Sequence, residues 1–319
     1  MISLNKNAMK IVNELMEEPE LYGCKARKMK CGVNLIDMGM ECPGSWQAAM
    51  MFTKVSIGNL GIVNLSKFKL NDQYTFSAID MFVERPKIAC LGSEIAGWEL
   101  AKGEYAMIGS GPARAIAHVA SDWYFAMTDY KDTYDHAVLC IQDARFPDDE
   151  IAMSIADACH VKPENTYLLF APSTCIVGSM QVSARMLEQT CHKMFEKKFD
   201  VSQIVLMRGS APIAPVVKDE TKTFGRINDA LIYGSEIEVW VDSDDISIAK
   251  VIHQLAGKTS SPNYGELFED VFVNADKNFF KVDHDVHSVG KIQIHNINSG
   301  RAYCAGEINY KALEQSFLR

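Results

Sequence analysis

Several short motifs that mark a cofactor site or a catalytic nucleophile are missing from this 319-residue chain. There is no G-x-x-x-x-G-K-[ST], which argues against a P-loop, and no complete G-x-G-x-x-G, which leaves a dinucleotide site without support. The sequence also has no G-x-S-x-G nucleophile elbow and no H-E-x-x-H zinc motif. The motifs therefore favour none of these common enzyme classes.

Positive charge is also scarce. Lys and Arg number 32 against 41 Asp and Glu, so the formal net charge is −9. A protein that binds nucleic acid needs a basic face, and no cluster of basic and aromatic residues offsets this deficit. We therefore expect no nucleic-acid partner.

Signals for secretion and membrane insertion are lacking too. Residues 1–20 have neither the apolar core nor the cleavage site of a signal peptide. The uncharged run 165–184 reaches membrane length, but Pro172, Gly178 and Gln181 favour a buried strand, a loop and the start of a helix. The nine cysteines are odd in number and form no C-x-x-C, which suits a reduced interior. We expect a cytoplasmic protein without a membrane segment.

Apolar runs and amphipathic segments alternate along the whole chain. Strands are predicted within 31–39, 55–65, 165–172, 203–217 and 228–245 and at the start of 87–100, helices in 7–18, 178–195 and 246–257, and a strand followed by a helix in 103–127 and 135–161. This interspersion favours an α/β fold, with α+β as the alternative. The length suits two domains, placed at 1–165 and 166–319, with an approximate boundary and terminal segments that can cross over.

The segment "GSMQVSARMLEQTCHKMF" (178–195) carries an arginine and a glutamate at helical spacing in apolar surroundings. On a helical wheel, apolar residues cover more than half of the circumference. Gln181, Arg185, Glu188 and His192 form a narrow polar stripe on the rest. Such a helix can line a cleft, or it can carry an ordinary i,i+3 ion pair on a solvated face. The pattern alone leaves both interpretations open.

Glycine-serine turns follow three buried runs, at 109–111, 178–179 and 209–210. Their bare backbone N–H groups can hold anions, although most such turns are simple tight connections. The stretch "VDHDVH" (282–287) can ligate a divalent ion or form a polar loop. The stretch "VDSDD" (241–245) is typical of a turn and helix N-cap.

Seven longer stretches together resemble one known family. They are 34–48, 88–100, 109–117, 171–194, 209–216, 225–234 and 297–309. In these stretches, and nearly from end to end, the sequence resembles the methenyltetrahydromethanopterin cyclohydrolases. The resemblance implies a two-domain α/β subunit with the substrate cleft between the domains, assembled as a homotrimer. The implied reaction belongs to one-carbon metabolism: reversible hydrolysis of N5,N10-methenyl-tetrahydromethanopterin to the N5-formyl compound, without a metal or redox cofactor.

The same resemblance assigns the site residues. The family's catalytic arginine and glutamate correspond to Arg185 and Glu188. A carboxylate beside the cationic methenyl carbon can orient and deprotonate water, and a neighbouring arginine keeps that carboxylate ionised and in place. The residues expected to bind the pterin or its anionic tail are Ser93, Glu94, Gly109, Ser110, Gly111, Ser179, Gln181, Ser210 and Asn228.

The chain departs from the family pattern at three places. It has Glu94 where a glutamine is expected, "GNLG" (58–61) where "GGLG" is usual, and "DHDVHSVGK" (283–291) in place of a stretch with Phe and Pro-Ala. The main alternative is a non-catalytic paralogue that binds the C1 pterin without turnover. A phosphoryl-transfer enzyme is a third interpretation, which the missing phosphate motif disfavours.

Overall fold

The computed structural model describes residues 2–100, 107–122, 124–125, 128–278 and 281–319. The chain forms two compact units: unit 1 is Met1–Gly61 with Lys87–Gln181, and unit 2 is Ile62–Pro86 with Val182–Arg319. The predicted division into domains at 165/166 stays a prediction. No helix among the described residues is long and apolar enough to cross a membrane.

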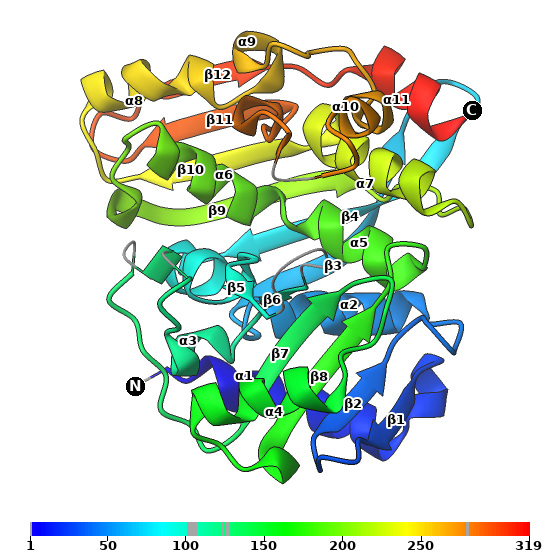
Figure 1. Cartoon of the computed structure of the whole chain (residues 1–319). Coiled ribbons are helices and arrows are strands. Elements are labelled where there is room, and N and C mark those ends of the chain that lie inside the picture. Colours follow the sequence, from blue (N-terminus) through cyan, green and yellow to red (C-terminus); the bar gives the residue numbers. More distant parts are fainter. Residues whose placement is uncertain (1, 101–106, 123, 126–127, 279–280) are drawn as a thin grey trace. The chain divides into compact units, whose positions relative to one another are not determined.

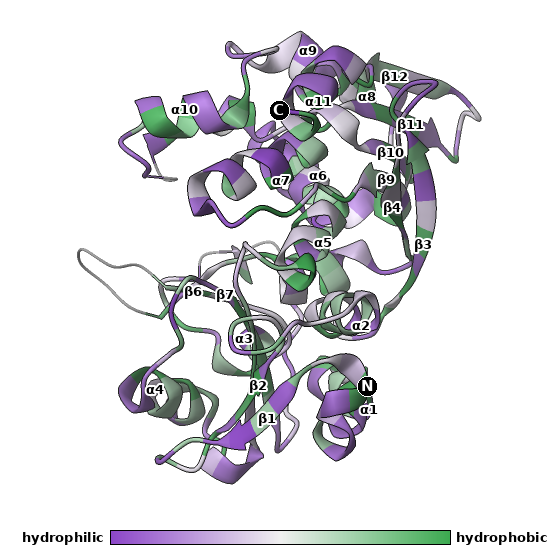
Figure 2. Ribbon diagram, turned by 90° about the vertical axis from the view of Figure 1, so that its right-hand side faces the viewer, coloured by the Kyte–Doolittle hydropathy of each residue, from purple (hydrophilic) through white to green (hydrophobic). Residues whose placement is uncertain are grey.

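Unit 1 contains a six-stranded mixed sheet with helices on both faces. Its elements are α1 (Leu4–Glu17), η1 (Pro19–Tyr22), β1 (Lys25–Lys28), β2 (Asn34–Asp37), α2 (Trp46–Ser56), η2 (Lys87–Glu94, a π-helix), β5 (Trp98–Glu99), β6 (Ile108–Ser110), α3 (Arg114–Ala117), β7 (Ala137–Gln142), α4 (Asp149–Cys159), η4 (Pro163–Asn165), β8 (Thr166–Ala171) and α5 (Ile176–Ala184). The strand order is β1-β2-β8-β7-β6-β5. Figure 2 shows α4 on one side of this sheet and α1 and α2 on the other.

The centre of this sheet is parallel. Strands β2, β8 and β7 run parallel, and β1, β6 and β5 extend the sheet with antiparallel pairs. Parallel strands covered on both faces read as continuous apolar runs, and nearly every residue of β7 and β8 is buried. The strands expected in 31–39, 135–161 and 165–172 are confirmed as β2, β7 and β8. The helices expected in 7–18 and in 135–161 are confirmed as α1 and α4.

Unit 2 contains the second six-stranded sheet. Its elements are β3 (Gly61–Lys69), β4 (Thr75–Val83), α6 (Met186–Glu196), η5 (Val201–Gln203), β9 (Ile204–Pro212), α7 (Glu220–Gly234), β10 (Glu236–Val241), α8 (Asp245–Val251), η6 (Ile252–Gln254), α9 (Gly257–Ser260), α10 (Phe268–Asn274), η8 (His284–Val286), β11 (Lys291–Asn296), β12 (Ala302–Gly306) and α11 (Tyr310–Phe317). The strand order is β12-β11-β10-β9-β4-β3. Among the strand pairs of this sheet whose register is described, β10 and β11 are parallel and the others are antiparallel.

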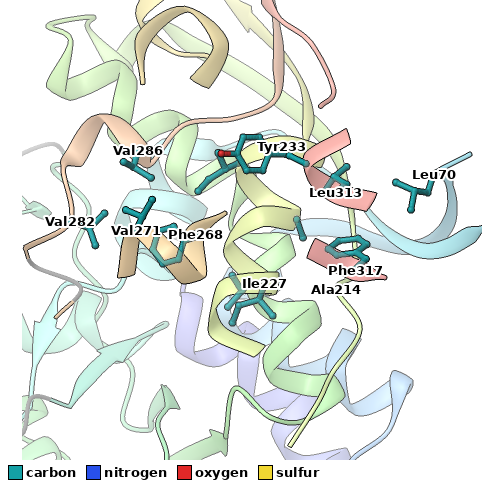
Figure 3. Close-up of a cluster of buried hydrophobic side chains, with 14 residues drawn as sticks. Leu70, Ala214, Ile227, Tyr233, Phe268, Val271, Val282, Val286, Leu313 and Phe317 are labelled. Carbon is teal, nitrogen blue, oxygen red and sulfur yellow. The ribbon is translucent and has the colours of Figure 1, made fainter. Parts of the chain in front are cut away.

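Strands β10 and β11 alternate buried and half-exposed residues, so one face of this sheet is covered. Figure 2 shows α6 and α7 on the same side of β9 and β10. Next to α7 lies an apolar cluster formed with α10, α11 and the segment before β11, shown in Figure 3. Both sheets together confirm the predicted α/β class.

Three of the expected strands are helical instead. The segment 55–65 was expected to form two strands joined by a turn, but residues 55–56 end α2, whose N-cap is Ser45, and only the part from Gly61 onward is a strand, β3. The run 87–94 is the π-helix η2. The strand prediction failed there because a short apolar run has no periodicity that distinguishes a strand from a helix. Residues 228–234 belong to α7, which is buried on almost all sides there and so shows no amphipathic pattern.

Two further predictions were partly correct. In 103–127 the described part of the strand is β6, and residues 103–106 lie outside the described residues. The helix after it, α3, ends after one turn because His118 takes a left-handed conformation at φ 44°.

The departure from the family pattern at Asn59 lies in the turn after α2, where Asn59 is also left-handed at φ 53°. Asparagine tolerates this conformation better than most residues, so this turn can form without a glycine at position 59.

A buried carboxyl group connects α7 to two other helices. Asp229 accepts hydrogen bonds from the backbone N–H of Phe268 at 2.8 Å and from the Ser316 hydroxyl at 2.7 Å. Burial raises the pKa of Asp229 from 3.8 to about 7. Between about pH 4 and pH 7 the folded state keeps a proton that the unfolded state has lost. Stability therefore falls by about 1.4 kcal/mol per pH unit as the pH rises through this window.

The Asp229→Asn variant should lack this dependence, because an amide accepts the same N–H without ionising. The free energy of unfolding of the variant, relative to that of the wild type, should rise by a few kcal/mol from pH 4.5 to pH 7.5. Each unit by which the pKa of Asp229 is raised contributes about 1.4 kcal/mol to this change. Urea unfolding at several pH values measures this difference. The fully exposed Asp72, replaced by Asn, is the control and should keep the wild-type slope. Parallel curves for Asp229→Asn and the wild type would contradict the assignment.

Candidate active site

The segment 178–195 forms two helices rather than the one expected. Helix α5 ends at Ala184, and α6 begins at Met186 (Figure 1). Arg185 between them has φ −69° and ψ 0°, and its N–H donates to the carbonyl of Val182 at 3.0 Å, a tighter i−3 bond. The break changes the phase of the predicted polar stripe and makes Arg185 the N-cap residue of α6.

Arg185 and Glu188 form the ion pair that the spacing predicts. Arg185 Nη1 lies 3.2 Å from Glu188 Oε2, and the side chains are only 16% and 10% exposed. Glu188 lies in the first turn of α6, where the helix dipole favours a carboxylate. The low exposure disfavours the solvated-face interpretation, since a fully solvated pair would have far more water around both groups. The catalytic role of the two residues stays a prediction.

Helix α6 packs closely on the sheet of unit 2 because Gly209 has no side chain. A Cβ atom at Gly209 would lie 2.8 Å from Ile237 Cδ1 and 3.1 Å from Leu187 Cδ2 and Met186 Sδ. The expected glycine-serine turn at 209–210 is thus the interior of β9, and Gly209 serves close packing. Ser210 follows it on β9, opposite Asp80 and Glu236.

Asn228 lies on α7, where it is buried. Its Nδ2 donates to the carbonyl of Phe224 at 2.8 Å, one helical turn earlier. The four predicted site residues that belong to unit 2 are therefore distributed over α6, β9, α7 and the residue before α6. Within this group, Arg185 and Glu188 are in direct contact.

In unit 1, two distant stretches of predicted site residues meet at the end of η2. The Gly111 N–H donates to the Ser93 carbonyl at 2.8 Å, and the Ser110 hydroxyl donates to the Glu94 carbonyl at 2.5 Å. The Ser93 hydroxyl donates to the Ser56 carbonyl at 2.6 Å. The last carbonyls of a helix have no partner inside the helix, and here the last residue of β6 and Gly111 after it supply partners, so the expected turn at 109–111 is largely strand. The Gly111 N–H is thus used within the protein.

The sequence did not predict the residues that hold this junction together. Arg114 and Asp122 form a bidentate ion pair at 2.6 and 2.8 Å, and both side chains are fully buried. Arg114 Nη1 also donates to the carbonyls of Ser93, at 2.9 Å, and Leu91, at 3.4 Å. Arginine within "GSGPAR" was the available signal, but its partner lies on a segment without regular periodicity.

The remaining predicted residues of unit 1 lie on β6 and α5. Gly109 permits contact with β7, because a Cβ there would lie 2.8 Å from Leu139 Cδ2. Ser179 and Gln181 are buried on α5, and the Gln181 amide hydrogen-bonds to Gln142, which in turn donates to the Ser173 hydroxyl at 2.7 Å. The predicted cleft stays a prediction.

The acidic stretch 282–287 binds lysines. Asp285 Oδ1 lies 2.8 Å from Lys193 Nζ and 2.7 Å from Lys197 Nζ. Among the described residues, no group of three or more His, Cys, Asp or Glu is arranged to hold a metal ion. The stretch "VDSDD" ends in the predicted N-cap: the Asp244 carboxylate accepts from the Ser247 N–H at the start of α8.

The two α/β units and the largely buried arginine–glutamate pair are features suited to an enzyme that uses acid–base chemistry. The chain belongs to the cyclohydrolase (MCH) family, whose model matches residues 3–317. It is 35% identical over 318 residues to the methenyltetrahydromethanopterin cyclohydrolase of Methanocaldococcus jannaschii, covering 99% of this chain and 98% of that protein. The proteins of that name from Methanothermobacter marburgensis and Methanobrevibacter smithii are each 34% identical, covering 99% of both chains. The resemblance stated from the motifs is confirmed.

Proposed function

We propose that this chain catalyses the reversible hydrolysis of N5,N10-methenyl-tetrahydromethanopterin to N5-formyl-tetrahydromethanopterin. Membership of the cyclohydrolase family and the names of its relatives support the reaction. The single structural observation that carries the mechanism is the Arg185–Glu188 pair at the break before α6. A carboxylate so placed has a fixed direction and little bulk water around it, which is what general-base chemistry requires.

The substrate carbon is part of an amidinium-like cation and is already electrophilic. Water attacks this carbon, and the Glu188 carboxylate accepts a proton from the water as the new C–O bond forms. The tetrahedral adduct then collapses, the bond from carbon to N10 breaks, and N10 takes up a proton. The products are the N5-formyl compound and one net proton released to solvent. Arg185 orients the Glu188 carboxylate by its hydrogen bond at 3.2 Å.

The other predicted residues are proposed to bind the pterin. These are Ser93, Glu94, Gly109, Ser110, Gly111, Ser179 and Gln181 of unit 1 and Ser210 and Asn228 of unit 2. Because the carbon is electrophilic without activation, we propose that the reaction needs no metal or redox cofactor. We also propose a cytoplasmic homotrimer, which light scattering would show as about three times the subunit mass.

A spectrophotometric assay tests the proposed reaction. Purified protein is mixed with methenyl-tetrahydromethanopterin in the presence of a metal chelator, and the loss of the amidinium chromophore is followed. We expect loss at a rate proportional to enzyme concentration, well above the buffer rate. Saturable binding of the pterin without loss of the chromophore would overturn the proposal and support the non-catalytic paralogue.

A further inference from the structure

One face of α6 is tied to the segment 282–288, far along the chain. Gln189 and Lys193 lie four residues apart on α6 and so share this face, and Lys197, the C-cap residue, follows four residues later. The Gln189 side chain donates to the Ser288 carbonyl at 2.8 Å, and both lysines bind the Asp285 carboxylate. These five residues are here called the α6 clamp.

The buried member of the clamp is Lys193. Its side chain is 2% exposed, and an ammonium group at such a position needs a charged partner. Burial lowers the pKa of Lys193, and the hydrogen bond from Lys193 to Asp285 opposes this shift. Burial favours a raised pKa for Asp285, but the hydrogen bonds from the two lysines outweigh it and lower that pKa. The charged pair is therefore a specific structural contact.

The segment that supplies Asp285 is anchored in the core of unit 2. Val282 and Val286 are each 4% exposed and belong to the apolar cluster that contains Phe268 and Val271. Figure 3 shows these valines beside α10. The backbone on both sides of Asp285 is thus fixed by buried valines. Through its bonds to Lys193 and Lys197, Asp285 therefore fixes the position of α6 relative to the apolar cluster.

The other end of the clamp lies next to the predicted base. Gln189 directly follows Glu188 in the first turn of α6. The helical hydrogen-bond pattern tightens at Arg185, so continuation of α5 alone does not set the direction of α6. Tertiary contacts must set it, with the sheet at Gly209 on one side and the clamp on another.

We propose that Lys193 and Asp285 are positioning residues that hold Glu188 at its working place through α6. The inference rests on the proposed role of Glu188. A displacement of about 1 Å at a catalytic group can cost about a hundredfold in rate, so a contact that orients a helix carrying the base has kinetic consequences.

The Lys193→Met variant should lower kcat about tenfold or more and leave KM within about twofold. Lys193→Arg should restore most of the rate, because it returns a cation to Asp285. Lys197→Met is the matched control: it also loses one bond to Asp285, but Lys197 lies after the end of α6, away from Glu188, and its loss should have a smaller effect. Rates are divided by the number of sites that bind substrate, which removes losses from unfolded protein.

The decisive comparison uses the Glu188→Gln background. A residue that acts through Glu188 should produce no further fall in the residual rate there. An equal tenfold fall in both backgrounds, or a kcat unchanged by Lys193→Met, would overturn the proposal. If Lys193→Met does not fold, Asp285→Asn replaces it, since it keeps the volume and removes the charge.

Hydrogen exchange separates this inference from the proposed function. The amides of residues 187–190 should exchange faster in Lys193→Met and in Asp285→Asn than in the wild type, whether or not the enzyme turns over. Unchanged exchange at these amides would overturn the clamp. A wild-type protein without turnover, but with faster exchange in the variants, would count against the proposed reaction alone.

Discussion

Replacing Glu188 by Gln is expected to lower kcat about a thousandfold while pterin binding changes only severalfold. The amide keeps the shape of the side chain and can still accept a hydrogen bond from Arg185, but it cannot take a proton from water. General-base catalysis typically contributes 10²–10⁴ in rate, so a loss of about 10³ follows if Glu188 is the base. The measurement is steady-state turnover of the methenyl pterin together with a titration of its binding.

The matched control is Glu196→Gln on the same helix. Glu196 lies at the other end of α6, 3.3 Å from His192, and is 25% exposed. The same chemical change there should leave turnover close to the wild-type value. Turnover of Glu188→Gln near the wild-type rate would refute the assigned role, and equal losses in both variants would show a general effect on the helix.

The largest loss of stability is expected from Arg114→Met. The substitution leaves the Asp122 carboxylate fully buried without its cation and removes a donor from the carbonyls of Leu91 and Ser93. Breaking a buried ion pair by removing one partner costs about 3–5 kcal/mol. Urea unfolding followed by a probe in unit 1 should show this loss as a lower transition midpoint.

A double variant tests the cause of that loss. With Asp122→Leu added, no charge stays buried, and much of the stability lost in Arg114→Met should return. Arg114→Lys should be intermediate, since an ammonium cannot form the bidentate pair. A double variant that is less stable than the single one would contradict this explanation.

The fold was predicted best where one kind of pattern was long and complete. The strands β7 and β8 are almost entirely buried apolar runs, and α1 and α4 have clear amphipathic periods. The prediction failed where burial on all sides hid the period, as in α7, or where a run was short, as in η2. A helix without a polar face and a strand without a polar face have the same local signature.

The site was predicted in part for a similar reason. The three-residue spacing of Arg185 and Glu188 is a local property, and their ion pair is confirmed. The hydrogen bond between Gly111 and Ser93 could not be predicted, because the two residues are too far apart in the sequence for any helical or strand periodicity to relate them. The partners Asp122 and Asp285 were likewise missed, because a carboxylate on an irregular segment carries no mark of the cation it binds.

The sequence by itself determined the α/β class, the family and the identity of the paired residues Arg185 and Glu188, because these depend on local patterns and ordered motifs. The tertiary structure decided that the helix breaks at Arg185 and that Gly209 serves packing. It also decided that Lys193 pairs with Asp285, 92 residues later. The physical reason is that desolvation and charge pairing act between groups that are close in space, and only the folded chain brings such groups together.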